Sequence, residues 1–174
     1  MMNKTRNTIF TAVGFLIMSF SVTPKNCESM LNIPTEIVEN LPDSKDPLVI
    51  RTFFGNDKDW HSVSEKLTKS YEMGFKAYVE LLDDRRFRNL TPEEIVELSK
   101  PHYKHTFIFV ADSLTFSNSE NTVLCIDLYN EIGKSFRVIP SEMWAVENNL
   151  SIANMDFHEF YESCDADGVF RGFE

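Results

Sequence analysis

Short apolar runs alternate with segments of helical periodicity from residue 47 onward. The apolar runs are rich in β-branched and aromatic residues, as strands are, and cover residues 48–54, 75–81, 106–111, 122–129 and 136–139. The helical segments carry apolar residues three or four positions apart and cover residues 57–74, 91–101, 141–148 and 156–163. The resulting order, β-α-β-α-β-β-β-α-α, predicts a mixed α/β (α+β) fold. We expect its helices to pack on a central mixed sheet of about five strands.

Individual residues mark the boundaries of several elements. Gly55-Asn56 ends the first strand, and Gly74 ends the first helix. Thr91-Pro92-Glu93-Glu94 combines an N-cap, a proline in the first turn and a capping-box glutamate, which predicts a helix start. Residues 106–111 are apolar without alternation, so we expect this strand to be covered on both faces. Asn130-Glu131-Ile132-Gly133 predicts the turn of a hairpin between the last two strands.

The N-terminus has the pattern of a secretory signal peptide. Lys4 and Arg6 precede an uncharged stretch from residue 7 to residue 24, whose apolar centre is short for a membrane span. The interpretation divides the chain into a leader over residues 1–21, a proline-rich linker over 22–46 and a single α/β domain over 47–174.

Two alternatives to export remain open at the N-terminus. Met30 can be the true start, in which case we expect a cytoplasmic protein. The leader can also be retained as a membrane anchor. If instead the leader is cleaved, we expect a periplasmic or secreted protein without a membrane partner.

The composition is that of one acidic globular domain. A chain of 174 residues has the size of a single domain, and 43% hydrophobic residues supply a core without a disulfide or metal. The formal net charge of -10 argues against nucleic acid as a partner, because nucleic acid attracts basic surfaces. Three cysteines, Cys27, Cys125 and Cys164, form no disulfide framework, and Cys125 lies in an apolar run typical of a buried thiol.

Two segments near the C-terminus are distinctive. The sequence FRVIPSEMW at residues 136–144 leads into ENNLSIANMDF at residues 147–157, and DADGVFRGF follows at residues 165–173. With these motifs, residues 45–174 resemble a bacterial family catalogued only as a domain of unknown function. The resemblance implies no activity. It supports the domain limits and favours Met30 as the start, because chains of that family begin close to the first strand.

The densest group of polar side chains lies between Trp144 and Asp156. Four residues there offer hydrogen-bonding side chains: Glu147, Asn148, Asn149 and Asn154. Beside a tryptophan, which is a common interface anchor, they favour a surface that binds a protein or a small polar ligand. The alternative is structural: Asn148 or Asn149 ends one helix, Asn154 or Asp156 caps the next, and Glu147 accepts hydrogen bonds from the backbone N–H groups of these residues.

Isolated charges among apolar neighbours form a second candidate site. They are Arg51, Glu80, Asp127 and Arg137 within the predicted strands, and Asp112 after the third strand. Buried charges require partners, and two arginines can pair with three acids. A pocket at the strand ends would suit a ligand, so Arg51, Asp127 and Arg137 are candidate binding residues. A purely structural ion network is the alternative.

Metal sites and catalytic motifs find little support. Five residues match positions of a calcium-binding loop: Ser163, Asp165, Asp167, Gly168 and Glu174. However, the first position is not an aspartate, and the sequence ends where an exiting helix should begin. His102 and His105 enter a strand at a spacing that points them to opposite sides. No nucleophile elbow or phosphate loop occurs, so we assign no catalytic residue, metal or cofactor.

The sequence therefore supports three functional hypotheses. The first is a non-enzymatic binding domain that uses the Trp144–Asp156 segment. The second is an acidic inhibitor, such as an immunity protein, that blocks a basic toxin. The third is a small hydrolase that uses Asp127, His105 or Glu147. The oligomeric state and the identity of the ligand or partner are left open.

Overall fold

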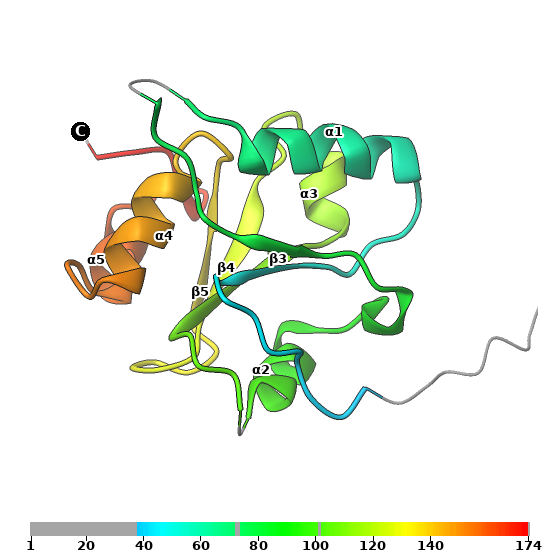
Figure 1. Ribbon diagram of the computed structural model, residues 1–174. Helices are drawn as coiled ribbons and strands as arrows, with labels where there is room; N and C mark the ends of the chain where they lie inside the picture. Colours follow the sequence, from blue (N-terminus) through cyan, green and yellow to red (C-terminus); the bar gives the residue numbers. More distant parts are fainter. Residues whose placement is uncertain (1–37, 72–73, 101, 174) are drawn as a thin grey trace, which may run out of the picture. The chain divides into compact units, whose positions relative to one another are not determined.

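A six-stranded mixed sheet forms the centre of the domain (Figure 1). The computed structural model describes residues 38–71, 74–100 and 102–173, so the predicted leader and the first part of the predicted linker lie outside the described residues. The strands are β1 (Leu48–Arg51), β2 (Glu80–Leu82), β3 (Phe107–Ala111), β4 (Val123–Asp127), β5 (Ser135–Val138) and β6 (Val169–Phe170). Their order across the sheet is β2-β1-β3-β4-β5-β6.

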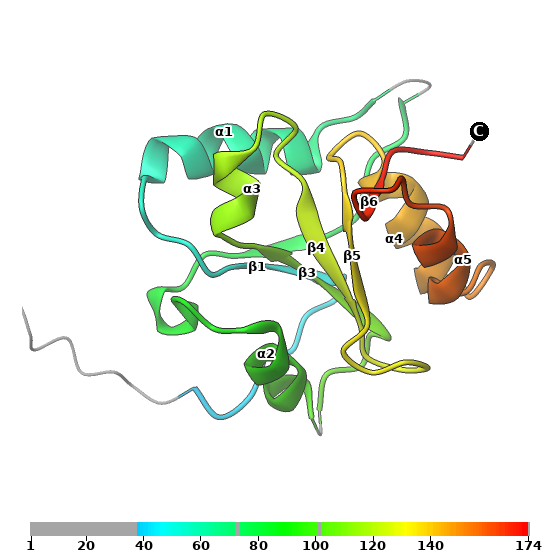
Figure 2. The ribbon, with the colours of Figure 1, turned by 180° about the vertical axis from the view of Figure 1, so that it is seen from behind.

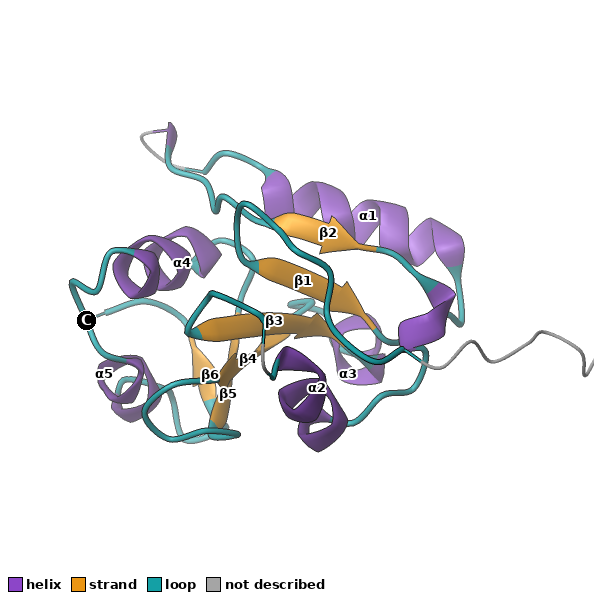
Figure 3. Ribbon diagram, turned by 60° about the horizontal axis from the view of Figure 1, so that its bottom comes forward, coloured by secondary structure: helices purple, strands orange, loops and turns teal. Residues whose placement is uncertain are grey.

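The strand directions divide the sheet into two parts. β1 pairs in parallel with both β2 and β3, so the carboxyl ends of these three strands lie at one edge of the sheet (Figure 3). β4 runs antiparallel to β3 and to β5, whereas β6 returns parallel to β5. The mixed α/β fold is thus confirmed, with parallel pairing early in the chain and antiparallel pairing later.

Five α-helices lie around the sheet in the described part of the chain. They are α1 (Asp57–Thr68), α2 (Pro92–Ser99), α3 (Ser113–Ser117), α4 (Met143–Ser151) and α5 (Phe157–Glu162). The predicted capping box at Thr91 is present in α2, where Thr91 Oγ1 accepts from Glu94 N and the Glu94 carboxylate accepts from Thr91 N. No helix in the described part of the chain is long and apolar enough to cross a membrane.

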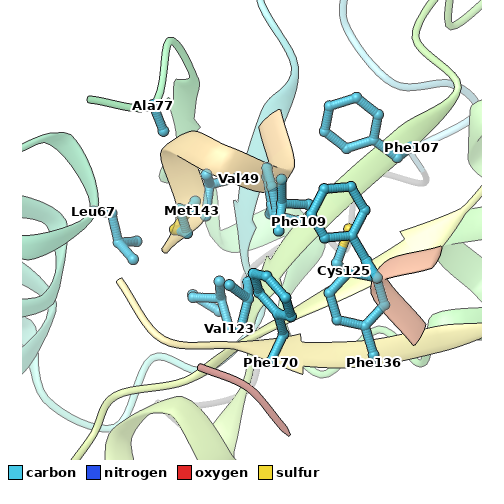
Figure 4. Close-up of a cluster of buried hydrophobic side chains, with 14 of the residues drawn as sticks. Val49, Leu67, Ala77, Phe107, Phe109, Val123, Cys125, Phe136, Met143 and Phe170 are labelled. Carbon is cyan, nitrogen blue, oxygen red and sulfur yellow. The ribbon is translucent and has the colours of Figure 1, made fainter. Parts of the chain in front are cut away.

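The larger core lies between one face of the sheet and α1, α4 and α5 (Figure 4). Every second strand residue contributes to it, as the period of two along a strand requires. These residues include Val49, Phe107, Phe109, Val123, Cys125, Phe136 and Val138. Trp60, Val63 and Leu67 form the predicted apolar stripe of α1, and all three are buried. Burial strongly raises the pKa of the Cys125 thiol, as expected of a cysteine inside a core.

A smaller core covers the opposite face with α2 (Figure 2). It contains the intervening strand residues Leu48, Ile50, Ile108, Val110 and Ile126. Residues 38–46, the described end of the predicted linker, also contribute to this face. Leu41 is buried there, and its N–H donates to the carbonyl of Leu98 at 3.1 Å.

Several elements differ from the sequence prediction. α1 ends at Thr68 and not at Gly74, and α4 covers Met143–Ser151 where residues 141–148 were predicted. β2 begins only at Glu80, because its partner β1 begins at Leu48, so residues 75–79 have no neighbouring strand. α3 was not predicted, since a helix of five residues is too short to show a period; Asp112 caps it by accepting from Thr115 N. β6 was not predicted either, because it has two residues and follows Gly168, whose φ of 76° is left-handed.

Candidate functional site

Glu147 lies in the middle of α4 and turns into the domain. It is 5% exposed, and both carboxylate oxygens have partners. Oε2 accepts from the Tyr78 N–H at 3.0 Å, and Oε1 accepts from the Ser151 hydroxyl at 2.8 Å. Glu147 therefore binds the extended segment before β2 to the helix. Tyr78 and Glu147, the residues in this contact, are 69 positions apart in the sequence.

The asparagines at the end of α4 form the turn into α5. Asn149 Nδ2 donates to the Ala145 carbonyl at 2.7 Å, and its Oδ1 accepts from Asn154 Nδ2 at 2.7 Å. Asp156 is the N-cap of α5, and its N–H donates to the Glu159 carboxylate at 2.7 Å. Asn149 and Asn154 therefore stabilise the turn, in line with the structural alternative. Glu147 is also structural, but its backbone donor is the distant Tyr78 N–H and not a residue at the helix ends.

The outer side of α4 has a different character. Trp144, Asn148 and Ile152 follow one another at four-residue spacing, which places them on one face. Phe75 stacks on Trp144 with ring centroids 4.5 Å apart and planes inclined by 13°. Tyr78 follows in the same extended segment, next to the Glu147 contact. We call these five residues the α4 surface.

Large apolar side chains are accessible on the α4 surface. Phe75 is 45% exposed, Tyr78 60% and Ile152 65%. Trp144 is half-buried and packs against the larger core, so the core holds the stacked pair in place. The Asn148 side chain is exposed and makes no hydrogen bond to any described residue. This surface is thus mainly aromatic and apolar. Its one side-chain amide, that of Asn148, has no hydrogen-bond partner among the described residues.

Two small hollows lie beyond the end of α4. His105 and Glu147 line one of about 380 Å³, and Asp127 lines the other, of about 100 Å³. The hollows share Thr106 and Leu150 among their lining residues. The three residues of the hydrolase hypothesis therefore surround one region of the domain.

The hydrogen bonds of these residues do not resemble a catalytic arrangement. Asp127 is buried, and its oxygens accept from the backbone N–H groups of Tyr129, Asn130 and Glu131 in the β4–β5 turn. Burial lowers the pKa of His105, whose Nε2 atom is buried without a hydrogen-bond partner. Both oxygens of Glu147 are occupied, as described above. Among these three residues, no hydrogen bond pairs a nucleophile with a base.

Arg51 ends β1 and is 2% exposed. Its guanidinium donates to Asp57 at 2.8 Å, to Asp83 at 3.1 Å and to the carbonyl of Phe53 at 3.0 Å. The same group lies 4.4 Å from the ring centroid of Phe54. This network joins the carboxyl ends of β1 and β2 to the start of α1.

Arg137 of β5 forms a second network with Asp112, which follows β3. The pair is bidentate, with distances of 2.6 and 3.1 Å, and Arg137 also donates to the hydroxyl and carbonyl of Thr122. Burial raises the pKa of Asp112, but hydrogen bonds from Arg137 and its charge outweigh this effect, so the pKa lies below its usual value. Glu80 is not part of either network, since it accepts from the backbone N–H groups of Lys45 and Asp46.

The charged residues therefore do not form one row. Arg51 and Arg137 belong to separate ion networks, and Asp127 and Glu80 are bound by backbone N–H groups.

In the C-terminal loop, two aspartates form ion pairs with one arginine. Asp165 and Asp167 bind the guanidinium of Arg171 at 2.6 and 2.8 Å, and Ser163 Oγ donates to the Glu159 carbonyl. Glu174 lies outside the described residues. Among the residues described, no group of three His, Cys, Asp or Glu side chains is placed to hold a metal ion.

The comparisons with known proteins concern the whole domain. A family profile described as a domain of unknown function (DUF6924) matches residues 46–173, well over half of the chain. The chain belongs to the DUF6924 family. This confirms the resemblance noted in the sequence. A search of curated proteins found no match to the chain. Membership of DUF6924 carries no activity, so the function of this domain has to be inferred from its surface.

The structure of the DUF6924 domain adds residues that the sequence did not single out. Phe75 begins the run over residues 75–81 that was predicted as a strand, yet it lies outside β2 and is stacked on Trp144 at the surface. Ile152 was regarded only as part of a polar segment. The position of Tyr78 beside α4 involves its contact with the distant Glu147, which no local pattern reveals. A signal that could have identified Ile152 is its four-residue spacing from Asn148 and Trp144.

Proposed function

We propose that this protein is a non-enzymatic interaction domain that binds another protein through the α4 surface. The observation that carries the proposal is the stacked pair of Phe75 and Trp144, in which Phe75 remains 45% exposed. Aromatic side chains are enriched at the centres of protein interfaces and account for much of the binding energy. Isolated exposed apolar residues are common, but several together on one surface are typical of an interaction site.

The nature of the exposed groups favours a protein over a small polar ligand. Most polar side chains of the Trp144–Asp156 segment already have partners within the domain: Glu147, Asn149 and Asn154. The accessible groups that remain are aromatic or aliphatic, except for Asn148. A polar metabolite would find few hydrogen-bonding groups there, whereas an apolar protein surface would be complementary.

The net charge indicates the chemistry of the partner. Two copies of a chain with a formal charge of -10 repel each other, so we propose a different protein with basic residues around an apolar centre. An inhibitor that blocks a basic toxin is a special case of this proposal and is the second candidate function, favoured by the same charge.

Site-directed photocrosslinking in cells tests the proposal. A photoreactive phenylalanine derivative replaces Asn148, and in the matched control it replaces Glu93, an exposed residue of α2. We expect an adduct with a specific protein from position 148 only. With that protein purified, Phe75→Ala and Ile152→Asp should each weaken binding about tenfold or more, as for interface hot spots, and Glu93→Ala should not. Adducts that are the same from both positions would overturn the proposal, and so would a cross-link to a second copy of this chain.

A further inference from the structure

An open groove of about 580 Å³ lies at the carboxyl ends of β1 and β2, next to the first turns of α1. Its lining residues are Arg51, Asp57, Trp60, His61, Ser64, Asp83 and Arg85. In sheets with parallel strands, ligands bind outside the carboxyl ends of the strands, because loops of several elements meet there. The α4 surface shares none of these residues, so the groove is considered independently of the proposed function.

The inner wall of the groove is fixed by Arg51. Its donors are largely used within the domain, by Asp57, Asp83 and the carbonyls of Phe53 and Asn56. Arg51 also lies 5.3 Å from the ring centroid of Trp60, on the core side of the groove. A charged group that is 2% exposed and bound on several sides holds the surrounding carboxylates in place.

Groups of both charges remain available on the outer wall. Arg85 uses one nitrogen, Nη2, which donates to Asp57 Oδ2 at 3.3 Å, and its other donors have no acceptor among the described residues. Asp83 uses Oδ1 for Arg51, and its Oδ2 has no donor there. On the core side of the groove, the indole N–H of Trp60, a residue only 8% exposed, likewise has no acceptor in the described part of the chain.

The charges of the groove balance. Two arginines, Arg51 and Arg85, face two carboxylates, Asp57 and Asp83. A simple anion would bind Arg85 but would be repelled by the carboxylates, and a simple cation would meet the opposite problem. A molecule with one negative and one positive end satisfies both sets of free groups.

We propose that this groove binds a small zwitterion with a carboxylate and an ammonium group, of the amino-acid or short-peptide class. The carboxylate accepts from the free guanidinium donors of Arg85 and from the Trp60 indole N–H. The ammonium donates to Asp83 Oδ2. Arg51 does not contact the ligand; it is a positioning residue that orients Asp83 and Asp57.

The indole N–H signals in a proton–nitrogen correlation NMR spectrum provide the test. The chain has two tryptophans, Trp60 in the groove and Trp144 on the α4 surface, so the two indole signals report on the two sites separately. A Trp144→Phe variant assigns them. The probes are glycine, β-alanine, 4-aminobutyrate and glycylglycine, which vary the distance between the charges; acetate and methylammonium each carry one charge only.

We expect at least one zwitterion to shift the Trp60 signal in a saturable way, while the Trp144 signal stays in place. Arg85→Gln and Asp83→Asn should each weaken this binding about tenfold or more, since each removes a charge-assisted hydrogen bond. Arg88→Gln and Asp59→Asn, exposed residues of the same types, should leave it unchanged. Each variant is compared with its own ligand-free spectrum, which also shows that it is folded.

Three results would overturn the proposal. The first is an unchanged Trp60 signal with every zwitterion. The second is a shift with acetate alone of the same size and midpoint. The third is a shift that survives both Arg85→Gln and Asp83→Asn. None of these results bears on the α4 surface, because protein binding there is measured with different variants.

Discussion

Arg51 and Arg137 show two uses of a paired arginine in one sheet. Register places Arg137 level with Leu124, Val110 and Ile50, whose side chains belong to the smaller core, whereas Arg51 is level with Ala111 of the larger core. The two arginines therefore lie on opposite faces of the sheet, near the same ends of the strands. Each is bound by carboxylates, but the surroundings of those carboxylates differ.

The difference lies in which partner is open to solvent. Around Arg137, both partners are largely covered, with side-chain exposures of 15% for Arg137 and 27% for Asp112. Around Arg51, the arginine is buried while Asp57 is 68% exposed and faces the groove. The first network is closed on itself and joins strands, whereas the second presents spare donors and acceptors to solvent. Open ion networks of this second kind are therefore where a ligand can bind.

Removing Asp112 should have the largest effect on stability. Asp112→Ala leaves the guanidinium of Arg137 without its carboxylate in a poorly hydrated position and removes the side-chain acceptor for Thr115 N, which keeps only the Asp112 carbonyl. We expect the free energy of unfolding to fall by about 3 kcal/mol, which lowers the melting temperature by roughly 10 °C. Urea unfolding of the full chain measures this change.

Glu97→Ala provides the control for that measurement, because Glu97 forms only an exposed ion pair with Lys100. Its loss should change stability by about 1 kcal/mol or less. A loss for Asp112→Ala no larger than that of the control would show that the closed network is not structural.

Glu147 extends the comparison to α4 with a smaller expected effect. Glu147→Ala leaves the Tyr78 N–H without its acceptor, so we expect a loss of about 2 kcal/mol. Asn148→Ala, one position further on, removes an exposed side chain and should change stability by about 0.5 kcal/mol or less. Thermal unfolding of the two variants measures the difference. Equal melting temperatures would contradict the division of α4 into a structural side and an interaction side.

Most of the fold could be predicted from local pattern. The apolar runs that became β1, β3, β4 and β5 lie in the middle of the sheet, where the surrounding core demands apolar residues. β6 was missed because two residues at an edge carry almost no pattern, and α3 because one helical turn shows no period. The extent of β2 depends on where β1 begins, which the residues of β2 do not encode.

The candidate sites were less predictable, because their residues meet through distant contacts. The sequence identified Trp144 and Arg51 as residues of interest but not Phe75 or Arg85, their neighbours in space. Phe75 lies three positions before Tyr78, whose N–H donates to Glu147 of α4, so this contact between distant residues helps to place Phe75 beside Trp144. The polar density of the Trp144–Asp156 segment was recognised, yet hydrogen bonds within the domain account for most of it.

Asp57→Asn should have a smaller effect than Asp112→Ala or Glu147→Ala and is the sharpest test of the comparison between the two arginines. Arg51 keeps Asp83 and two backbone carbonyls in this variant, and the exposed side chain at position 57 remains hydrated. We expect a loss of about 1 kcal/mol or less, part of it from the negative charge in the first turn of α1.

Salt distinguishes the two networks further in the same unfolding experiment. Exposed charge interactions are screened by salt, so the effect of Asp57→Asn should shrink at about 1 M sodium chloride. The effect of Asp112→Asn should persist, because its partner Arg137 is covered by protein. If Asp57→Asn costs as much as Asp112→Asn and resists salt, the Arg51 network is as closed as that of Arg137. The groove beside it would then be a consequence of packing, with no exchangeable charge to offer a ligand.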